Sequence, residues 1–148
     1  MKPSSRARVV DASVAAKLFV PEEYSDRAQR LFSLLESDNP IILFVPDLLY
    51  LECANLFRSR TKMRVMSAAE AKKASEILHA LPLESLAIRE FSAQALDLSI
   101  QYDLSAYDAC YLAVSVHLKL PLITADKKFA RKLSGSAHRV IWIGEWKE

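Results

Sequence analysis

Short runs of β-forming residues alternate along this chain with longer stretches of helical patterning. The runs rich in Val, Ile and Leu cover residues 8–10, 41–45, 83–88, 122–124 and 140–143. Apolar residues recur at helical spacing over residues 22–36, 47–61, 68–81, 89–102 and 106–118. With only 2 Gly and few hairpin signals, the strands must be joined by helical crossovers. We therefore predict an α/β fold, a three-layer α/β/α sandwich with a mainly parallel central sheet.

The length and composition predict one domain with surface to spare for a partner. A chain of 148 residues fits a single compact domain covering residues 1–148. The formal charge is only +2, so attraction to a polyanion must come from local patches. The apolar fraction of 51% is high for a small soluble protein, which leaves apolar residues for an oligomeric or partner interface.

The cysteines and the hydropathy predict a cytoplasmic protein. Cys53 and Cys110 have neither metal-binding nor redox spacing and lie in helix-like segments, as reduced buried thiols do. Asp11 and Lys17 interrupt the apolar stretch near the N-terminus, so we expect no signal peptide. No run approaches the length of a membrane span.

Two aspartates stand where a β-like run gives way to a helix-like segment. They are Asp11 in RVVDASVA and Asp126 in LITADKKF. In an open α/β sheet ligands bind outside the carboxyl ends of the strands, which is where both residues are expected. Each is equally suited to be the N-cap of the helix that follows, which for Asp126 covers residues 127–133. The local sequence leaves both interpretations open.

Glu52 lies on the apolar stripe of its predicted helix. In PDLLYLECANLF it follows Leu48 by four residues and precedes Leu56 by four. A carboxylate turned toward a core must be neutral, hydrogen-bonded, paired or bound to a metal. The alternatives to a functional role are that Glu52 reaches the sheet edge, or that Arg58 or Lys62 neutralises it.

Asp108 lies in the segment LSAYDACYLAVSVHL. It shares a helical face with Tyr111, Leu112 and Ser115. Ser105 and Asp108 also have the spacing of a capping box, with an acid in the first turn that the helix dipole favours. Taken alone, Asp108 is explained by this capping role.

The four acids together point to a divalent cation. We expect Asp11, Glu52, Asp108 and Asp126 at one sheet edge, where clustered carboxylates repel one another unless a cation compensates them. No histidine shares a motif with them, so the ligands are oxygens, which suit Mg²⁺ or Mn²⁺ rather than zinc. A nucleophile elbow, a Walker loop and a dinucleotide-binding glycine motif are all absent from the sequence. The chemistry is therefore expected of the metal and its water.

The order of these motifs resembles the PIN-domain ribonucleases and, in size and layout, the VapC-type toxins of toxin–antitoxin modules. The matching segments are VVDASVAAK, PDLLYLECANLF, LSAYDACYLAVSVHLKLPLITADKKF and RVIWI. The resemblance implies a PIN-like fold and Mg²⁺- or Mn²⁺-dependent hydrolysis of RNA phosphodiester bonds. It also implies a homodimer held inactive by a small antitoxin protein.

The resemblance assigns roles to the acids. It carries the acidic quartet of the family to Asp11, Glu52, Asp108 and Asp126. The three aspartates would hold the metal, directly or through water. The glutamate would be a further ligand or would orient the attacking water.

Neighbouring polar positions match the family in part. Ser13 and Thr124 match hydroxyl positions that support the acids, and Asn55 matches a polar position one turn after the glutamate. Many relatives carry another acid shortly beyond the last aspartate, where this chain has Lys127 and Lys128. The resemblance therefore does not imply a second metal site.

Two basic stretches are candidates for contacts with the RNA backbone. The candidate residues are Arg58, Arg60, Lys62, Lys127 and Lys128, in stretches that contain no acid. The alternative is that they are solvated helix ends that complement the helix dipole.

Two other functions compete with a nuclease. A PIN-like module that binds RNA or protein without cutting would be expected to have lost at least one acid, yet all four are present. A phosphatase with Asp11 as nucleophile would be expected to carry a second acid close by, and DASVA contains none.

Overall fold

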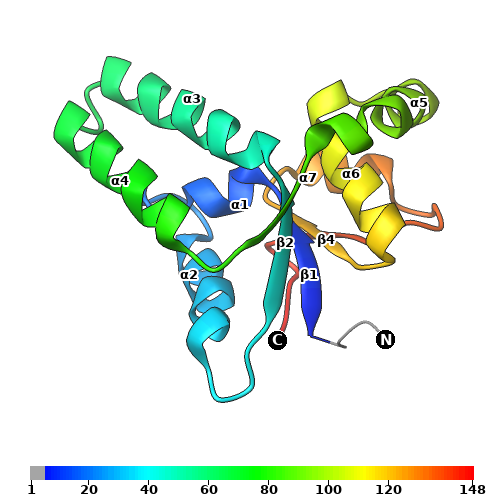
Figure 1. Ribbon diagram of the computed structural model, residues 1–148, viewed down its shortest axis with the longest axis horizontal. Helices are drawn as coiled ribbons and strands as arrows, with labels where there is room; N and C mark the ends of the chain where they lie inside the picture. Colours follow the sequence, from blue (N-terminus) through cyan, green and yellow to red (C-terminus); the bar gives the residue numbers. More distant parts are fainter. Residues whose placement is uncertain (1–5) are drawn as a thin grey trace.

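Five parallel strands form one central sheet in the computed structural model, which describes residues 6–148 (Figure 1). The strands are β1 (Ala7–Val10), β2 (Ile42–Pro46), β3 (Glu84–Leu86), β4 (Leu122–Thr124) and β5 (Val140–Trp142). The helices are α1 (Ala12–Ala16), α2 (Ser25–Ser33), α3 (Leu48–Lys62), α4 (Ala68–Ala80), α5 (Ser92–Tyr102), α6 (Ala106–Leu118) and α7 (Lys127–Lys132), with the 3-10 helices η1 (Leu34–Glu36) and η2 (Ile88–Glu90). The predicted α/β architecture with a parallel sheet is confirmed.

The strand order β3-β2-β1-β4-β5 places a change of winding direction in the middle of the sheet. From β1 the chain moves outward through β2 to β3, then returns to the other side of β1 for β4 and β5. Val9 pairs with Phe44 of β2 on one side and with Leu122 of β4 on the other. A crevice forms where two neighbouring crossovers leave in opposite directions, here at the carboxyl ends of β1 and β4.

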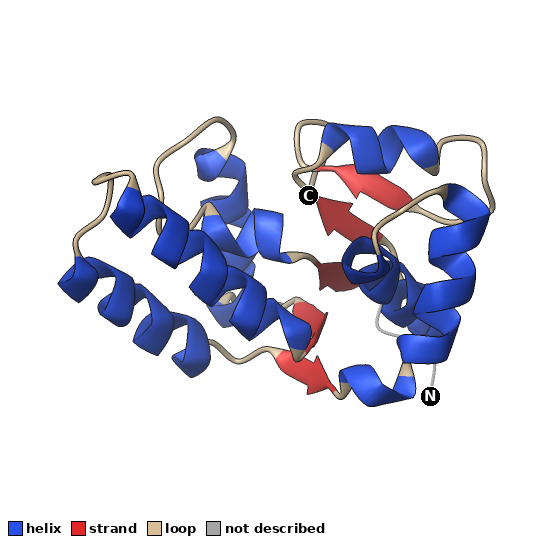
Figure 2. Ribbon diagram, turned by 90° about the horizontal axis from the view of Figure 1, so that it is seen from above, coloured by secondary structure: helices blue, strands red, loops and turns tan. Residues whose placement is uncertain are grey.

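Helices cover both sides of the sheet. Figure 1 shows α3 and α4 side by side on one side of the strands and α5 and α6 on the other, and Figure 2 shows the strands crossing between these groups. Helix α6 packs on β1, β2 and β4, and α5 packs on its outer side. All residues from Ala109 to Ser115 are buried, which makes α6 part of the hydrophobic core. Its N-terminus is therefore held rigidly near the carboxyl ends of the central strands.

The helix predicted over residues 22–36 begins at Ser25, three positions later than expected. Tyr24 has φ 64°, a left-handed conformation that cannot continue into a right-handed helix. The Glu22 backbone N–H instead donates to the Ser25 hydroxyl at 3.0 Å. The predicted start was wrong because this turn breaks a segment whose composition favours a helix.

The helix predicted from residue 89 also begins three positions later than expected. The α-helix α5 starts at Ser92, after the 3-10 helix η2.

Helices α2 and α3 differ in the exposure of their large apolar residues. The large apolar residues of α2, Leu31 and Phe32, are buried in the core. Leu51 of α3, in contrast, is 72% exposed. Among the helices of residues 6–148, none is long and apolar enough to cross a membrane.

Candidate active site

A cavity of about 390 Å³ opens at the carboxyl ends of β1 and β4. All four acids singled out in the sequence line it: Asp11, Glu52, Asp108 and Asp126. They come from the turn after β1, from α3, from the first turn of α6 and from the turn after β4. The fold therefore gathers at one crevice four carboxylates that are far apart in the sequence.

Asp11 is the buried centre of this site, with 4% of its surface exposed. Its Oδ1 accepts hydrogen bonds from the Ser13 hydroxyl at 2.5 Å and from the Val14 backbone N–H at 3.2 Å. Its Oδ2 accepts from the Thr124 hydroxyl at 2.5 Å. Asp11 is thus the N-cap of α1, as one interpretation of the sequence proposed, and it lines the cavity as well. The two roles do not exclude each other.

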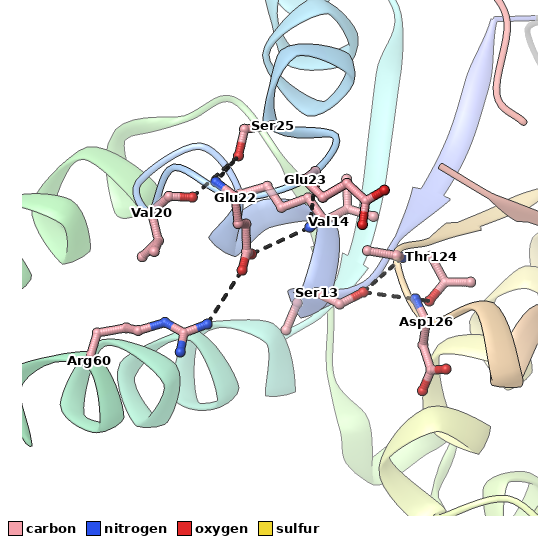
Figure 3. A network of polar contacts seen from close by, with 12 residues as sticks. Ser13, Val14, Val20, Glu22, Glu23, Ser25, Arg60, Thr124 and Asp126 are labelled. Atoms are coloured by element: carbon pink, nitrogen blue, oxygen red, sulfur yellow. Dashed lines mark hydrogen bonds and ion pairs between the residues drawn. The ribbon is translucent and has the colours of Figure 1, made fainter. Parts of the chain in front are cut away.

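Backbone N–H groups of the neighbouring turn fix the direction of these hydroxyl bonds. The Ala125 N–H donates to Ser13 Oγ at 2.9 Å, and the Asp126 N–H donates to Thr124 Oγ1 at 3.0 Å (Figure 3). Because each hydroxyl oxygen already accepts from the backbone, its own proton is free to point at Asp11. The turn after β4 is therefore bound to the turn after β1 through two hydroxyl groups.

Burial opposes the ionised form of Asp11. It raises the pKa of Asp11 to about 7, although the hydrogen bonds from Ser13, Thr124 and Val14 lower it; the charge of Asp108 raises it further. The carboxylate is thus hydrogen-bonded as an anion but lies in a site that penalises the charge. A cation in the cavity would remove this conflict.

Glu52 and Tyr111 form a second buried polar pair beside the cavity. Glu52 Oε1 and the Tyr111 hydroxyl are both buried, and neither makes a hydrogen bond to another group within residues 6–148. Burial raises the pKa of Glu52, the nearby Tyr111 hydroxyl lowers it and the charge of Asp108 raises it. The two groups are thus close enough to interact but do not have hydrogen-bond geometry. Arg58 and Lys62 do not pair with Glu52, so the proposed neutralisation by these residues is not found.

Asp108 lies half-buried in the first turn of α6. Its backbone N–H donates to the Ser105 hydroxyl at 3.0 Å, which confirms Ser105 as the N-cap. Burial raises the pKa of Asp108 and the charge of Asp126 raises it further, while Ser105 and Lys132 lower it. The charge of a neighbouring acid thus contributes to the raised pKa of Asp11, Glu52 and Asp108, as expected for a cluster of like charges.

Asp126 is exposed and caps α7. Its Oδ1 accepts from the Phe129 backbone N–H at 3.0 Å. The capping interpretation of this residue is confirmed, and Asp126 also lines the cavity with the other acids.

The donor set of the cavity fits a hard divalent cation. No histidine or cysteine is among the described residues that line it, so its possible ligands are oxygens. Glu52 Oε1, buried without a hydrogen bond, is an atom that a cation would satisfy. Within residues 6–148, however, no three Asp, Glu, His or Cys side chains lie close enough to form a ready metal-binding group. The four acids share a cavity, but their side chains are not arranged as a ligand cluster.

The polar and basic residues singled out in the sequence divide into two sets. Asn55 and Arg60 line the cavity. Arg58, Lys62 and Lys128 are exposed residues outside its lining. Lys127 also lies outside it, with its ammonium 4.4 Å from the centre of the Trp142 ring. The fold thus brings only Arg60 of the predicted basic residues to the acids.

Sequence reasoning missed three polar residues of the cavity wall: Lys17, Glu22 and Tyr111. Tyr111 carries a detectable signal, because it lies one turn after Asp108 on the same face of its helix. Lys17 and Glu22 carry none, since they reach the cavity from the end of α1 and from the turn that follows it, outside any periodic segment.

The fold and the site define an α/β protein with an acidic cavity at the carboxyl ends of a parallel sheet. Residues 8–133 match the PIN domain family, and the chain belongs to that family. It is 33% identical over 128 residues to Ribonuclease VapC3 of Pyrobaculum aerophilum, an alignment that covers 84% of this chain and 92% of that protein.

Two solved structures share the fold. VapC20 of Mycobacterium tuberculosis, a sarcin-ricin loop cleaving toxin, has a TM-score of 0.65 at 19% identity, covering 84% of this chain and 93% of its own. A toxin–antitoxin complex from Klebsiella pneumoniae contains a chain with a TM-score of 0.63 at 17% identity, covering 92% of this chain and 97% of that chain. The family and the fold predicted from the sequence are both confirmed.

The buried carboxyl of Asp11 makes the metal-free protein sensitive to pH. Its pKa is about 7 in the folded state against an ordinary value of 3.8, so the folded state binds more protons than the unfolded state between these values. The free energy of unfolding in EDTA should therefore fall as the pH rises from about 5 to about 8. Asp11→Asn should show a smaller fall, because the carboxyl of Asp11 no longer titrates. Part of the fall should remain, because the pKa values of Glu52 and Asp108 are also raised.

Urea unfolding at the two pH values measures this difference. The control is Asp97→Asn on the exposed surface of α5, which should leave the fall unchanged. An equal fall in wild type and Asp11→Asn would show that this carboxyl does not carry the effect.

Proposed function

We propose that this protein is a metal-dependent endoribonuclease that hydrolyses RNA phosphodiester bonds and acts as the toxin of a toxin–antitoxin pair. Membership of the PIN domain family and the likeness to Ribonuclease VapC3 support this proposal. The observation that carries it is the cavity that brings together the four acids Asp11, Glu52, Asp108 and Asp126, of which Asp11 is buried and Glu52 has an oxygen that lacks a hydrogen bond. Such an arrangement costs stability unless a cation binds it.

In this proposal the three aspartates, Asp11, Asp108 and Asp126, hold Mg²⁺ or Mn²⁺, directly or through water. A bound ion of this kind lowers the pKa of a water molecule, orients the phosphate and stabilises charge on the leaving oxygen. Glu52 completes the set as a further ligand or as the group that orients the attacking water. Asn55, which also lines the cavity, is proposed as a supporting polar residue of the site.

Ser13 and Thr124 serve as positioning residues. Their hydroxyls donate to both oxygens of Asp11 and hold its carboxylate plane in one orientation. They also favour the ionised state that a metal ligand needs, because hydrogen bonds to a carboxylate lower its pKa. We assign them support of the site, without direct contact with the substrate.

A reducing cytoplasm is the proposed location. Cys53 and Cys110 are both free and buried. Burial raises the pKa of Cys53 to about 12, and the charges of Glu52 and Asp11 add to this effect. A thiol held in its neutral form is not a nucleophile. Cys53 is thus a packing residue and has no part in the proposed reaction.

The first test of the function is metal-dependent cleavage of RNA. We expect EDTA to abolish cleavage and added Mg²⁺ or Mn²⁺ to restore it. Asp108→Asn should reduce the rate by more than about a hundredfold. Losing a residue that only supports a metal ligand costs up to about a hundredfold, and losing a ligand should cost more. Asp97→Asn, which removes the same charge outside the cavity, should cleave like wild type. Undiminished cleavage by the pure protein in excess EDTA would exclude a metal-dependent nuclease.

The second test separates the cap from the ligand at Asp126. Asparagine caps a helix about as well as aspartate, so Asp126→Asn keeps the bond from Phe129. In EDTA the variant should melt at a higher temperature than wild type, because one charge that opposes Asp108 is gone. Added Mg²⁺ should stabilise the variant less than wild type, because the stabilisation follows occupancy of the folded state. The measurement is four melting curves, and an equal gain from Mg²⁺ would show that Asp126 is not a ligand.

We further propose that the toxin is a homodimer inhibited by an antitoxin protein. The exposed Leu51 of α3 supports an apolar interface on this helix. The Klebsiella pneumoniae relative of the same fold was solved as a toxin–antitoxin complex, which supports a protein partner. The partner interface is assigned to α3 alone, since α2 offers no large exposed apolar residue within the described chain.

Leu51→Ser tests the dimer. Light scattering should show a dimer for wild type and a shift toward monomer for Leu51→Ser, with the melting temperature of the monomer unchanged because the side chain is exposed. Ile77→Ser on α4 changes another exposed apolar residue, outside α3, and should leave the dimer intact. A wild-type protein that is monomeric at every concentration would contradict the proposal.

A further inference from the structure

Three charged residues form an ion-paired group on the wall of the acidic cavity. Glu22 Oε1 lies 3.4 Å from Lys17 Nζ, and Glu22 Oε2 lies 3.4 Å from Arg60 Nη2. All three side chains line the cavity, and Figure 3 shows Arg60 reaching from α3 toward Glu22. The carboxylate of Glu22 thus lies between the two cations, and each of its oxygens pairs with one of them.

The chain holds Glu22 in this place independently of the cations. Its backbone N–H donates to the Ser25 hydroxyl, which in turn donates to the Val20 carbonyl at 3.3 Å. Lys17 is also fixed separately, because its ammonium donates to the Glu23 carbonyl at 2.7 Å and its side chain is only 11% exposed. Loss of the Glu22 charge would therefore leave Lys17 at the cavity.

The two cations lie on the same elements as the acids, further from the sheet edge. Glu52, Leu56 and Arg60 follow one another at intervals of four residues along one face of α3, and all line the cavity. The helix rise separates Glu52 from Arg60 by about 12 Å along the axis. Helix α1 has the same polarity, since Asp11 is its N-cap and Lys17 its C-cap. The cavity therefore runs from an acidic end to a cationic end.

We propose that Lys17 and Arg60 bind a phosphate of the RNA strand next to the scissile one, and that Glu22 takes the place of this phosphate in the free protein. This inference rests on the proposed ribonuclease function and adds a binding position to it. A lysine and an arginine on either side of an anion form the charge-assisted contacts by which proteins bind phosphate groups. The carboxylate of Glu22 supplies the same charge to the same donors.

Glu22 weakens RNA binding in this scheme. The strand can use Lys17 and Arg60 only when Glu22 has left them. The apparent affinity is therefore the intrinsic affinity multiplied by the fraction of molecules in which both cations are free. The ion pairs are partly exposed, with side-chain exposures of 33% for Glu22 and 30% for Arg60, which makes the exchange feasible. The alternative is that Glu22 simply ties α3 to the turn before α2.

Removal of the Glu22 charge distinguishes a phosphate-mimicking role of Glu22 from a purely structural one. Binding of a short fluorescein-labelled single-stranded RNA is measured in Mg²⁺ by anisotropy, with Asp108→Asn added to every variant so that the RNA stays intact. Glu22→Gln should lower the Kd by about three- to tenfold, the range that two partly exposed ion pairs allow. This is a gain of binding, so it cannot arise from unfolding.

The matched control is Glu148→Gln. Glu148 also bridges two cations, Arg6 at 3.7 Å and Arg30 at 2.8 Å, and it lies outside the lining of the cavity. It changes the net charge by the same amount, so any general electrostatic gain appears in both variants. The inference requires that Glu22→Gln increase the affinity for the RNA more than Glu148→Gln does.

Arg60→Gln supplies the opposite effect. It should raise the Kd and reduce the slope of log K against log salt by about 0.7, the value for one cation on a single strand. If Glu22→Gln and Glu148→Gln change the Kd equally while wild type cleaves RNA, Glu22 is a structural ion pair and only this inference is overturned. If wild type neither cleaves nor binds RNA, the proposed function is overturned together with it.

Discussion

The buried carboxylate of Asp11 organises the site. It accepts the hydroxyl protons of Ser13 and Thr124, and these hydroxyl oxygens accept backbone N–H groups from the turn after β4. Two crossovers that leave the sheet in opposite directions are thereby joined at the point where they separate. Hydrogen bonds favour the ionised form of the same carboxylate while burial opposes it, and burial raises its pKa to about 7. Structure and proposed chemistry thus depend on one side chain.

Two helices that start near this centre each carry an acid and a cation of the cavity. Glu52 and Arg60 lie on one face of α3, and Asp11 and Lys17 lie at the two ends of α1. An extended strand of RNA would meet carboxylates at one end and cations at the other. This polarity suits a nuclease, because the acids alone repel a polyanion and the cations alone supply no site for hydrolysis.

Much of the site was predictable because local signals and the strand order coincide. Asp11 and Asp126 follow β-like runs, and parallel strands bring their carboxyl ends to one edge, so both acids could be placed without coordinates. Glu52 was conspicuous as an acid on an apolar stripe. Both aspartates proved to be helix caps as well as cavity residues, because a turn that joins a strand to a helix at the carboxyl edge of the sheet meets both requirements.

The sequence by itself determined the parallel α/β architecture, the candidate caps Asp11, Ser105 and Asp126, and the four acids, since periodicity and capping depend on residues close together in the chain. Only the tertiary structure decided which basic residue meets the acids. Of the predicted cations it brings Arg60 to the cavity and adds Lys17 and Glu22, which no pattern marked. Their meeting depends on the left-handed turn at Tyr24 and on the packing of α1 beside α3. Contacts of this kind join segments whose separation along the chain carries no periodic signal, so they exist only once the chain has folded.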